Sequence, residues 1–293
     1  MRAAMRCRAA PGSSLGAMRV LLTNDDGIQA EGLGHLREAL LELPGIDLLV
    51  VAPDGNRSAM ARSITVRRPL WVQEYTFADG GLGYATDGTP VDCVRLASLG
   101  LVDGWSPELV VSGINHGSNL GDDITYSGTV AAALEAIVLG LPGIAVSQQS
   151  AALELDFRQS ESFDFTAAAA FTARLVAELA TTPLAEGTLL NVNFPGRAPE
   201  GIEVARLGRR LYRDALALLQ TDPAQPDRRL YRVYGEAVEP SEEEADTDVA
   251  AIASGRVAVT PLHFDLTDHT GVRTLLEHGL DHLLEPARRT SES

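Results

Sequence analysis

The sequence predicts an α/β protein with a Rossmann-like, mostly parallel sheet covered by helices on both faces. From residue 18 onwards, short apolar runs alternate with stretches in which apolar residues recur at helical spacing. Strands that are buried on both faces read as continuous apolar runs, whereas their crossover helices are amphipathic. Beyond residue 195 two similar Leu-Tyr-Arg segments flank a proline-containing middle, which predicts an extended C-terminal β-hairpin arm.

The expected elements follow in chain order. Thr89 and Pro90 mark the start of one helix as N-cap and first-turn proline, and Gly140 ends the next. Strands are expected at 19–23, 46–53, 107–115, 142–148, 188–195 and 257–262. Helices are expected at 31–43, 89–101, 127–140, about 163–180 and 268–284.

Four segments organise the chain as one α/β domain with an arm. Residues 1–17 carry arginines but lack the apolar core of a secretory signal, and we interpret them as a disordered tail or a mis-assigned start. Residues 18–198 form the α/β catalytic core, and residues 199–245 form an extended arm for oligomerisation. Residues 246–293 supply a strand and a helix that complete the fold.

Two details of the arm carry expectations of their own. The hairpin should pair residues 206–214 with residues 227–235, and a hairpin this long needs a partner surface to be stable. The acidic run at 239–248 is interpreted as a solvated loop.

Composition excludes several classes of protein. A net charge of −16 argues against non-specific binding to nucleic acid or to an anionic membrane. No apolar run in the sequence reaches the length of a membrane span. Cys7 and Cys93 form no disulfide or zinc pattern, which favours a cytoplasmic location.

Polar side chains gather where the expected strands end. Asn24, Asp25 and Asp26 follow the first strand, while the segments 53–58 and 112–123 follow two others. Each alone is most simply a turn or a helix cap. The carboxyl ends of parallel strands, however, meet at one edge of a sheet, which is where ligands bind in such folds.

These residue types suit a hard divalent cation beside a phosphate. Mg²⁺ and Mn²⁺ prefer carboxylate, amide and hydroxyl oxygens. The helix that opens at Ser127, Gly128 and Thr129 offers free backbone N–H groups to an anion. A metal beside an anion site predicts hydrolysis of a phosphate ester.

The motifs resemble a known family. "MRVLLTNDDG", "VVAPDGNRSAMARSITVRRPL", "DGTPVDCVRLA", "VVSGINHGSNLGDDITYSGTVAAALEA" and "LNVNFP" occur in the order found in the survival protein SurE family. The resemblance runs from Met18 to about Pro195, and "VAVTPLHFDLT" at 257–267 fits the family's C-terminal part. It implies a metal-dependent 5′-nucleotidase that hydrolyses nucleoside monophosphates, and it leaves 3′-nucleotidase and exopolyphosphatase activity open.

The resemblance also implies roles for single residues. It makes Asp25, Asp26, Ser58 and Asn115 the ligands of one divalent metal ion per subunit, Mg²⁺ or Mn²⁺. It assigns phosphate binding to Asn119, Ser127, Gly128 and Thr129. Asp25 and Asp26 are also the expected catalytic residues, and a homodimer or homotetramer is the expected assembly.

Some choices stay open at this level. Either aspartate could orient or deprotonate the attacking water, and a covalent aspartyl intermediate is an alternative. His116 and Ser118 receive no role. Among rival functions, a dinucleotide-dependent oxidoreductase and a P-loop ATPase lack their glycine motifs here. The strongest rival is a non-catalytic regulatory module that binds metal and nucleotide.

Overall fold

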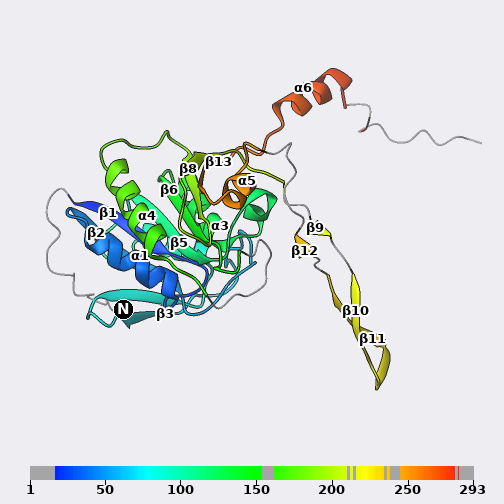
Figure 1. Cartoon of the computed structure of the whole chain (residues 1–293), viewed down its shortest axis with the longest axis horizontal. Coiled ribbons are helices and arrows are strands. Elements are labelled where there is room, and N and C mark those ends of the chain that lie inside the picture. Colours follow the sequence, from blue (N-terminus) through cyan, green and yellow to red (C-terminus); the bar gives the residue numbers. More distant parts are fainter. Residues whose placement is uncertain are drawn as a thin grey trace, which may run out of the picture. The chain divides into compact units, whose positions relative to one another are not determined.

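The computed structural model describes residues 17–153, 162–209, 212–213, 216–233, 236–237, 245–280 and 283 (Figure 1). The chain forms two compact units, one ending at His263 and the other beginning at Phe264. None of the helices within these described ranges combines the length and the apolar content that crossing a membrane would require. The N-terminal tail expected at 1–17 lies outside the described residues except for Ala17.

A nine-stranded sheet forms the centre of the first unit. Its pairs are parallel except for β3 with β4 and β13 with β7, so the expected mostly parallel sheet is confirmed. The spatial order is β3 (Val72–Thr76), β4 (Leu82–Thr86), β2 (Ile46–Pro53), β1 (Met18–Thr23), β5 (Leu109–His116), β6 (Gly143–Gln148), β7 (Thr188–Phe194), β13 (Val257–His263) and β8 (Ile202–Val204).

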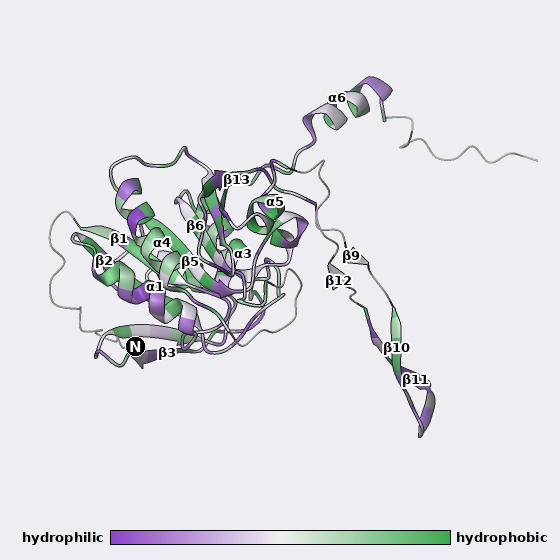
Figure 2. Cartoon of the chain, viewed as in Figure 1, coloured by the Kyte–Doolittle hydropathy of each residue, from purple (hydrophilic) through white to green (hydrophobic). Residues whose placement is uncertain are grey.

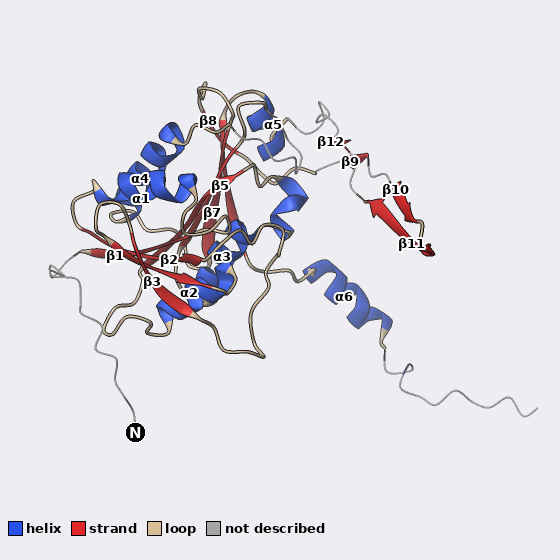
Figure 3. Ribbon diagram, turned by 90° about the horizontal axis from the view of Figure 1, so that it is seen from below, coloured by secondary structure: helices blue, strands red, loops and turns tan. Residues whose placement is uncertain are grey.

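Helices cover both faces of this sheet (Figure 3). Helices α1 (Glu31–Leu41) and α4 (Thr166–Leu179) share one apolar core with the strands, while α2 (Pro90–Ser98) and α3 (Gly128–Val138) share another. Figure 2 shows the hydrophobic residues concentrated in the central strands and the helix faces that meet them. Burial of these two apolar layers is the main stabilising contribution in such a fold.

Two helix starts agree with the sequence. Thr89 caps α2 in a capping box with Asp92, and Pro90 occupies the first helical position. Ser127 caps α3, since its hydroxyl accepts a hydrogen bond from the backbone N–H of Val130. A short 3₁₀ helix, η1 (Gly121–Thr125), leads from the glycine-rich loop into this cap.

The hairpin is present, but its strands differ from those expected. β10 (Ala217–Asp222) pairs with β11 (Gln225–Arg232), and β9 (Tyr212–Arg213) pairs with β12 (Glu236–Ala237). The first strand therefore does not span 206–214. Arg206 instead forms a bridge with Thr247, and residues 202–204 belong to the main sheet as β8.

The acidic run ends in a buried turn, which corrects part of the loop expected at 239–248. Residues 238–244 lie outside the described part, but Thr247 and Asp248 have no exposed surface. Thr247 caps helix α5 (Asp248–Ala253), which the sequence analysis missed. Polar side chains in this turn accept hydrogen bonds from backbone N–H groups and can therefore be buried. The acidic composition of the segment was not sufficient to predict that it is exposed.

The second unit contains helix α6 (His269–His278), which is shorter than the helix expected at 268–284. Gly279 follows it with φ +61°, a left-handed conformation in which glycine commonly ends a helix. Residues 281–282 and 284 lie outside the described residues.

Candidate metal and phosphate site

Asp25 sits in a tight turn that follows β1. The side chain of Asn24 closes the turn by bonding both the N–H and the carbonyl oxygen of Gly27. The Asp25 side chain is almost fully buried, and its Oδ1 accepts a hydrogen bond of 2.6 Å from the Thr129 hydroxyl. The first turn of α3 therefore holds this carboxylate in place.

Gly128 allows this close approach. A Cβ atom at this position would lie 2.7 Å from Asp25 Oδ2, closer than two such atoms can pack. The glycine of the "SGT" turn thus serves the contact between α3 and Asp25.

Asn115 points its amide oxygen towards the same place. Its Nδ2 donates to the carbonyl oxygen of Gly117 at 2.8 Å, which fixes the orientation of the amide. Its Oδ1 lies 3.4 Å from the Thr129 hydroxyl, which also contacts Asp25. Asp25 and Asn115 therefore present oxygen atoms around one shared hydroxyl.

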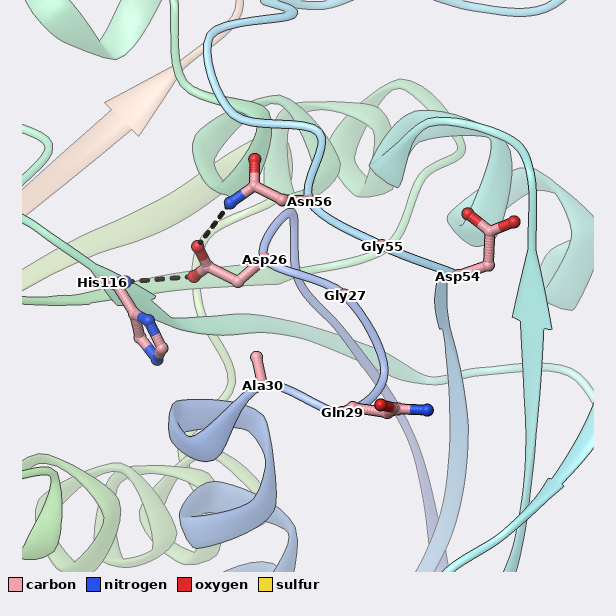
Figure 4. Close-up of a pocket in the computed structure, with 8 residues that line it drawn as sticks. All are labelled: Asp26, Gly27, Gln29, Ala30, Asp54, Gly55, Asn56 and His116. Atoms are coloured by element: carbon pink, nitrogen blue, oxygen red, sulfur yellow. Dashed lines mark hydrogen bonds between the residues drawn. The ribbon is translucent and has the colours of Figure 1, made fainter. Parts of the chain in front are cut away.

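Asp26 is held by the neighbouring strand and loop (Figure 4). Its Oδ2 accepts from the backbone N–H of His116 at 3.1 Å, and its Oδ1 lies 3.4 Å from Asn56 Nδ2. Asn56 Oδ1 in turn accepts from the backbone N–H of Ser58 at 2.8 Å. This chain of contacts brings the exposed Ser58 to the edge that carries the two aspartates.

Burial makes both carboxylates costly to ionise. Burial, and secondarily the charge of Asp26, raise the pKa of Asp25 from 3.8 to about 6, against the lowering effect of the Thr129 hydrogen bonds. Burial raises the pKa of Asp26 to about 6 as well. Among the described residues, no Arg, Lys or His forms an ion pair with either aspartate.

This donor set fits a hard divalent cation. The site offers the oxygen ligands that Mg²⁺ and Mn²⁺ prefer, namely carboxylate, amide and hydroxyl oxygens. Its two carboxylates form no ion pair with any residue that the structure describes. The described residues contain no group of three or more His, Cys, Asp or Glu side chains suited to a metal. An ion at this site would therefore complete its shell with neutral oxygens, which suits a site that must also accept water and phosphate.

Asn119 is fixed from several sides. Its backbone N–H donates to Asn193 Oδ1, and its carbonyl oxygen accepts from the side chains of Asn191 and Asn193. Its side-chain amide donates to Ser147 Oγ at 2.8 Å. Asn119, the residue expected to bind phosphate, is therefore buried and held in place. Its side-chain N–H donor is already engaged by Ser147.

Several neighbours of the aspartates carry no sequence motif that would reveal them. His116 contributes its backbone N–H to Asp26, and its Nε2 lies 3.4 Å from the N–H of Gly32 at the start of α1. Its ring stacks on Phe163 and Phe165. Asn56 joins Asp26 to the Ser58 loop. The only sequence signal for His116 was its position directly after Asn115. Its contacts are made by the backbone and by ring stacking, and such contacts leave no recognisable sequence motif.

Comparison with known proteins identifies the family. The sequence model described as "Survival protein SurE" matches residues 20–214. The chain belongs to the SurE family. A relative named 5′-nucleotidase SurE from Rubrobacter xylanophilus is 52% identical over 261 residues, covering 88% of this chain and 96% of that protein. Another of the same name from Pelotomaculum thermopropionicum is 45% identical over 256 residues, covering 86% and 92%.

A solved structure agrees with the SurE assignment. The SurE protein from Aquifex aeolicus aligns with a TM-score of 0.73 at 36% identity, covering 89% of this chain and 99% of that one. Membership of the SurE family, taken with the oxygen donors around Asp25, implies a divalent metal cofactor.

Proposed function

We propose that this chain is a metal-dependent 5′-nucleotidase, which hydrolyses nucleoside monophosphates to nucleoside and inorganic phosphate. One observation carries the proposal. In a SurE family member, two adjacent aspartates lie against an oriented amide oxygen and a helix N-terminus at the carboxyl edge of the sheet, and within the described part of the chain neither forms an ion pair. Ligands bind at that edge in open α/β folds.

Asp25, Asp26, Asn115 and Ser58 are the proposed ligands of one Mg²⁺ or Mn²⁺ ion per subunit. When bound, the ion supplies polarisation of a phosphoryl oxygen and a water of lowered pKa. Asp25 is oriented by Thr129, and Asp26 is oriented by the N–H of His116. Either carboxylate can accept the proton of the attacking water.

The phosphoryl group is proposed to lie between these carboxylates and the first turn of α3. The helix dipole and the N–H of Gly128 favour negative charge there. The Thr129 hydroxyl is engaged with Asp25, and the Ser127 hydroxyl caps the helix. The N–H of Ser127 donates to the carbonyl oxygen of Ile124, and the N–H of Thr129 donates to Asp25. Phosphate binding by the Ser127, Gly128 and Thr129 turn is therefore assigned to the N–H of Gly128 and the positive end of α3, and Asn119 would contribute its amide after release from Ser147.

The test is phosphate release from a panel of 5′- and 3′-nucleoside monophosphates and polyphosphate, with Mg²⁺, Mn²⁺ or chelator. We expect 5′-monophosphates to be hydrolysed with a divalent ion and not with chelator. A protein that binds nucleotide and Mn²⁺ without releasing phosphate would instead be the regulatory module.

Asp25→Asn is the matched variant. It keeps the shape of the side chain but removes the charge that attracts a dication, so we expect loss of activity and weaker Mn²⁺ binding by calorimetry. If Asp25 only capped the next helix, Asn would cap it equally well, and both stability and metal affinity would stay nearly unchanged. Unchanged Mn²⁺ binding would refute the metal assignment.

We further propose a homodimer or homotetramer in the cytoplasm. The hairpin supports the assembly because several of its apolar side chains are exposed, namely Leu216, Leu218, Leu219, Leu230 and Val233. The location rests on Cys93, a buried free thiol, and on a sequence without disulfide spacing.

A further inference from the structure

A pocket of about 320 Å³ opens beside the proposed metal site. Asp26 forms part of its wall, together with Gln29, Asp54, Asn56 and His116 (Figure 4). Asp26 is thus shared between the pocket and the oxygen donors around Asp25. A phosphate group held at the aspartates would direct its ester substituent into this pocket.

The charge of the pocket excludes a second phosphate. Its charged lining side chains are carboxylates, Asp26 and Asp54, and Asp54 is paired with Arg57 at 2.6 Å. Carboxylate and amide oxygens accept hydrogen bonds, whereas anions need donors. The lining therefore suits a neutral group that carries hydroxyl and amine donors.

His116 gives the pocket a rigid aromatic wall. Its ring stacks on Phe163 at 5.1 Å and on Phe165 at 5.0 Å between centroids. Its Nε2 accepts a hydrogen bond from the N–H of Gly32, which fixes the ring against α1. The ring is consequently held in one orientation before any ligand arrives, so little conformational entropy is lost when a planar group packs on it.

We propose that this pocket is the nucleoside subsite and that His116 is its specificity-determining residue, which stacks with the nucleobase. The proposal rests on the nucleotidase function proposed above and names the residues that would select nucleotides over other phosphate esters. Stacking tolerates any base, because every base has a π face. Ribose hydroxyls and base amines would donate to Asp54, Asn56 and Gln29.

The experiment measures product inhibition of the Mn²⁺-loaded protein during hydrolysis of a 5′-monophosphate. Adenosine, uridine, ribose and inorganic phosphate are the probes. For the unmodified chain, nucleosides should inhibit competitively and more strongly than ribose. His116→Ala should raise the inhibition constants of both nucleosides roughly tenfold. The constant for inorganic phosphate should not change, because phosphate binds on the other side of Asp26.

Two further variants separate stacking from structural damage. His116→Phe keeps an aromatic face and should restore nucleoside inhibition. His35→Ala is the control, since His35 also contacts Phe165, at 5.9 Å, but is not part of the pocket wall; it should leave every inhibition constant unchanged. An equal rise for phosphate and nucleosides in His116→Ala, or no rise for nucleosides, would overturn the proposal.

Failure of the two proposals can be told apart. If no monophosphate is hydrolysed, calorimetry of adenosine and phosphate with the Mn²⁺-loaded protein replaces inhibition as the readout. Adenosine binding that depends on the His116 ring would then support the subsite while the nucleotidase function fails. If monophosphates are hydrolysed but adenosine binding does not depend on the His116 ring, the nucleotidase function stands and the subsite proposal fails.

Discussion

At the scale of single residues, Asp25 and Asp26 carry a cost in the metal-free protein that a bound cation would remove. Both are adjacent and substantially buried, and hydrogen bonds from Thr129 and the His116 backbone only partly offset the loss of hydration. A dication reverses the sign of this electrostatic effect. The unbound protein should therefore be less stable around these residues than the metal-bound protein.

The pH dependence of stability follows from the raised pKa values. Each aspartate keeps its proton up to about pH 6 in the folded chain, against a usual pKa of 3.8. This stabilising contribution is complete below about pH 4 and is lost as the pH rises through 6.

Chemical unfolding of the metal-free protein and of Asp25→Asn between pH 4 and 7.5 measures this contribution. The variant should be the more stable protein at pH 7.5, and its advantage should shrink as the pH falls. An advantage that instead grows on acidification would contradict the raised pKa. Adding Mn²⁺ at pH 7.5 should restore the stability of the unmodified chain only.

Gly128 offers a second test at this scale. In Gly128→Ala the new methyl group would lie 2.7 Å from Asp25 Oδ2 and displace the carboxylate. Mispositioned ligands commonly cost 10- to 100-fold in metal affinity, and we expect roughly that loss by calorimetry, with activity falling in parallel.

Gly34→Ala is the matched control for this variant. A Cβ at Gly34, inside α1, meets no atom within 4 Å. Alanine there should stabilise the helix by up to about 1 kcal/mol without changing metal affinity. Normal Mn²⁺ binding in Gly128→Ala would show that Asp25 tolerates displacement or is not a ligand.

The sequence indicates the proposed charged ligands more readily than the residues that position them. Two aspartates directly after an apolar strand are conspicuous, because nothing in a buried strand end otherwise requires charge. Asn56 acts by linking Asp26 to the Ser58 loop, and His116 acts through its backbone and its ring stack. Such contacts arise only when distant segments pack together, so spacing along the chain does not reveal them.

At the scale of elements, Glu135 on α3 anchors the loop that follows Ser58. It is buried, and its two oxygens accept from Arg62 Nη2 at 2.8 Å and Arg95 Nη1 at 2.7 Å. Arg62 belongs to the loop, and Arg95 belongs to α2. One carboxylate thereby fixes the loop to both helices on this face of the sheet.

Glu135→Gln should loosen this loop. We expect a loss of roughly 1–2 kcal/mol of stability, less than for fully buried pairs because both arginines are partly exposed and can regain water. Mn²⁺ affinity should also fall, since Ser58 is positioned by the same loop. Glu200→Gln, which disrupts the exposed Arg197–Glu200 pair, should change neither melting temperature nor Mn²⁺ affinity appreciably.

The elements that the sequence predicted well are those with one strong local signal. β1, β2, β5, β6 and β7 are apolar runs, and α2 carries its capping box in the sequence. Strands β3 and β4 were missed because their half-exposed residues give no continuous apolar run. Helix α5 was missed because Asp248, which accepts from Gly121 and Gly208, reads as part of an acidic surface run.

At the scale of the whole molecule, the hairpin should determine the assembly. Its strands β10 and β11 pair only with each other among the described residues and expose a set of leucines. A two-stranded hairpin is marginally stable alone in water, so a second copy of the chain is its expected partner surface.

Replacing residues 212–237 by a short flexible linker should reduce the molar mass measured by light scattering. The melting temperature of the core should change much less, because the hairpin is not part of the nine-stranded sheet. A chain that is already monomeric at micromolar concentration, or a replaced chain of unchanged mass, would count against this role.

The place of β13 between β7 and β8 bears on how the chain can fold while it is being made on the ribosome. β13 (257–263) pairs with β7 and β8, both of which precede residue 205, and the hairpin is synthesised in between. Until β13 emerges, the edge of β7 stays open to pairing with other chains. Products of premature termination within residues 205–256 should therefore aggregate, although they already contain every proposed metal ligand.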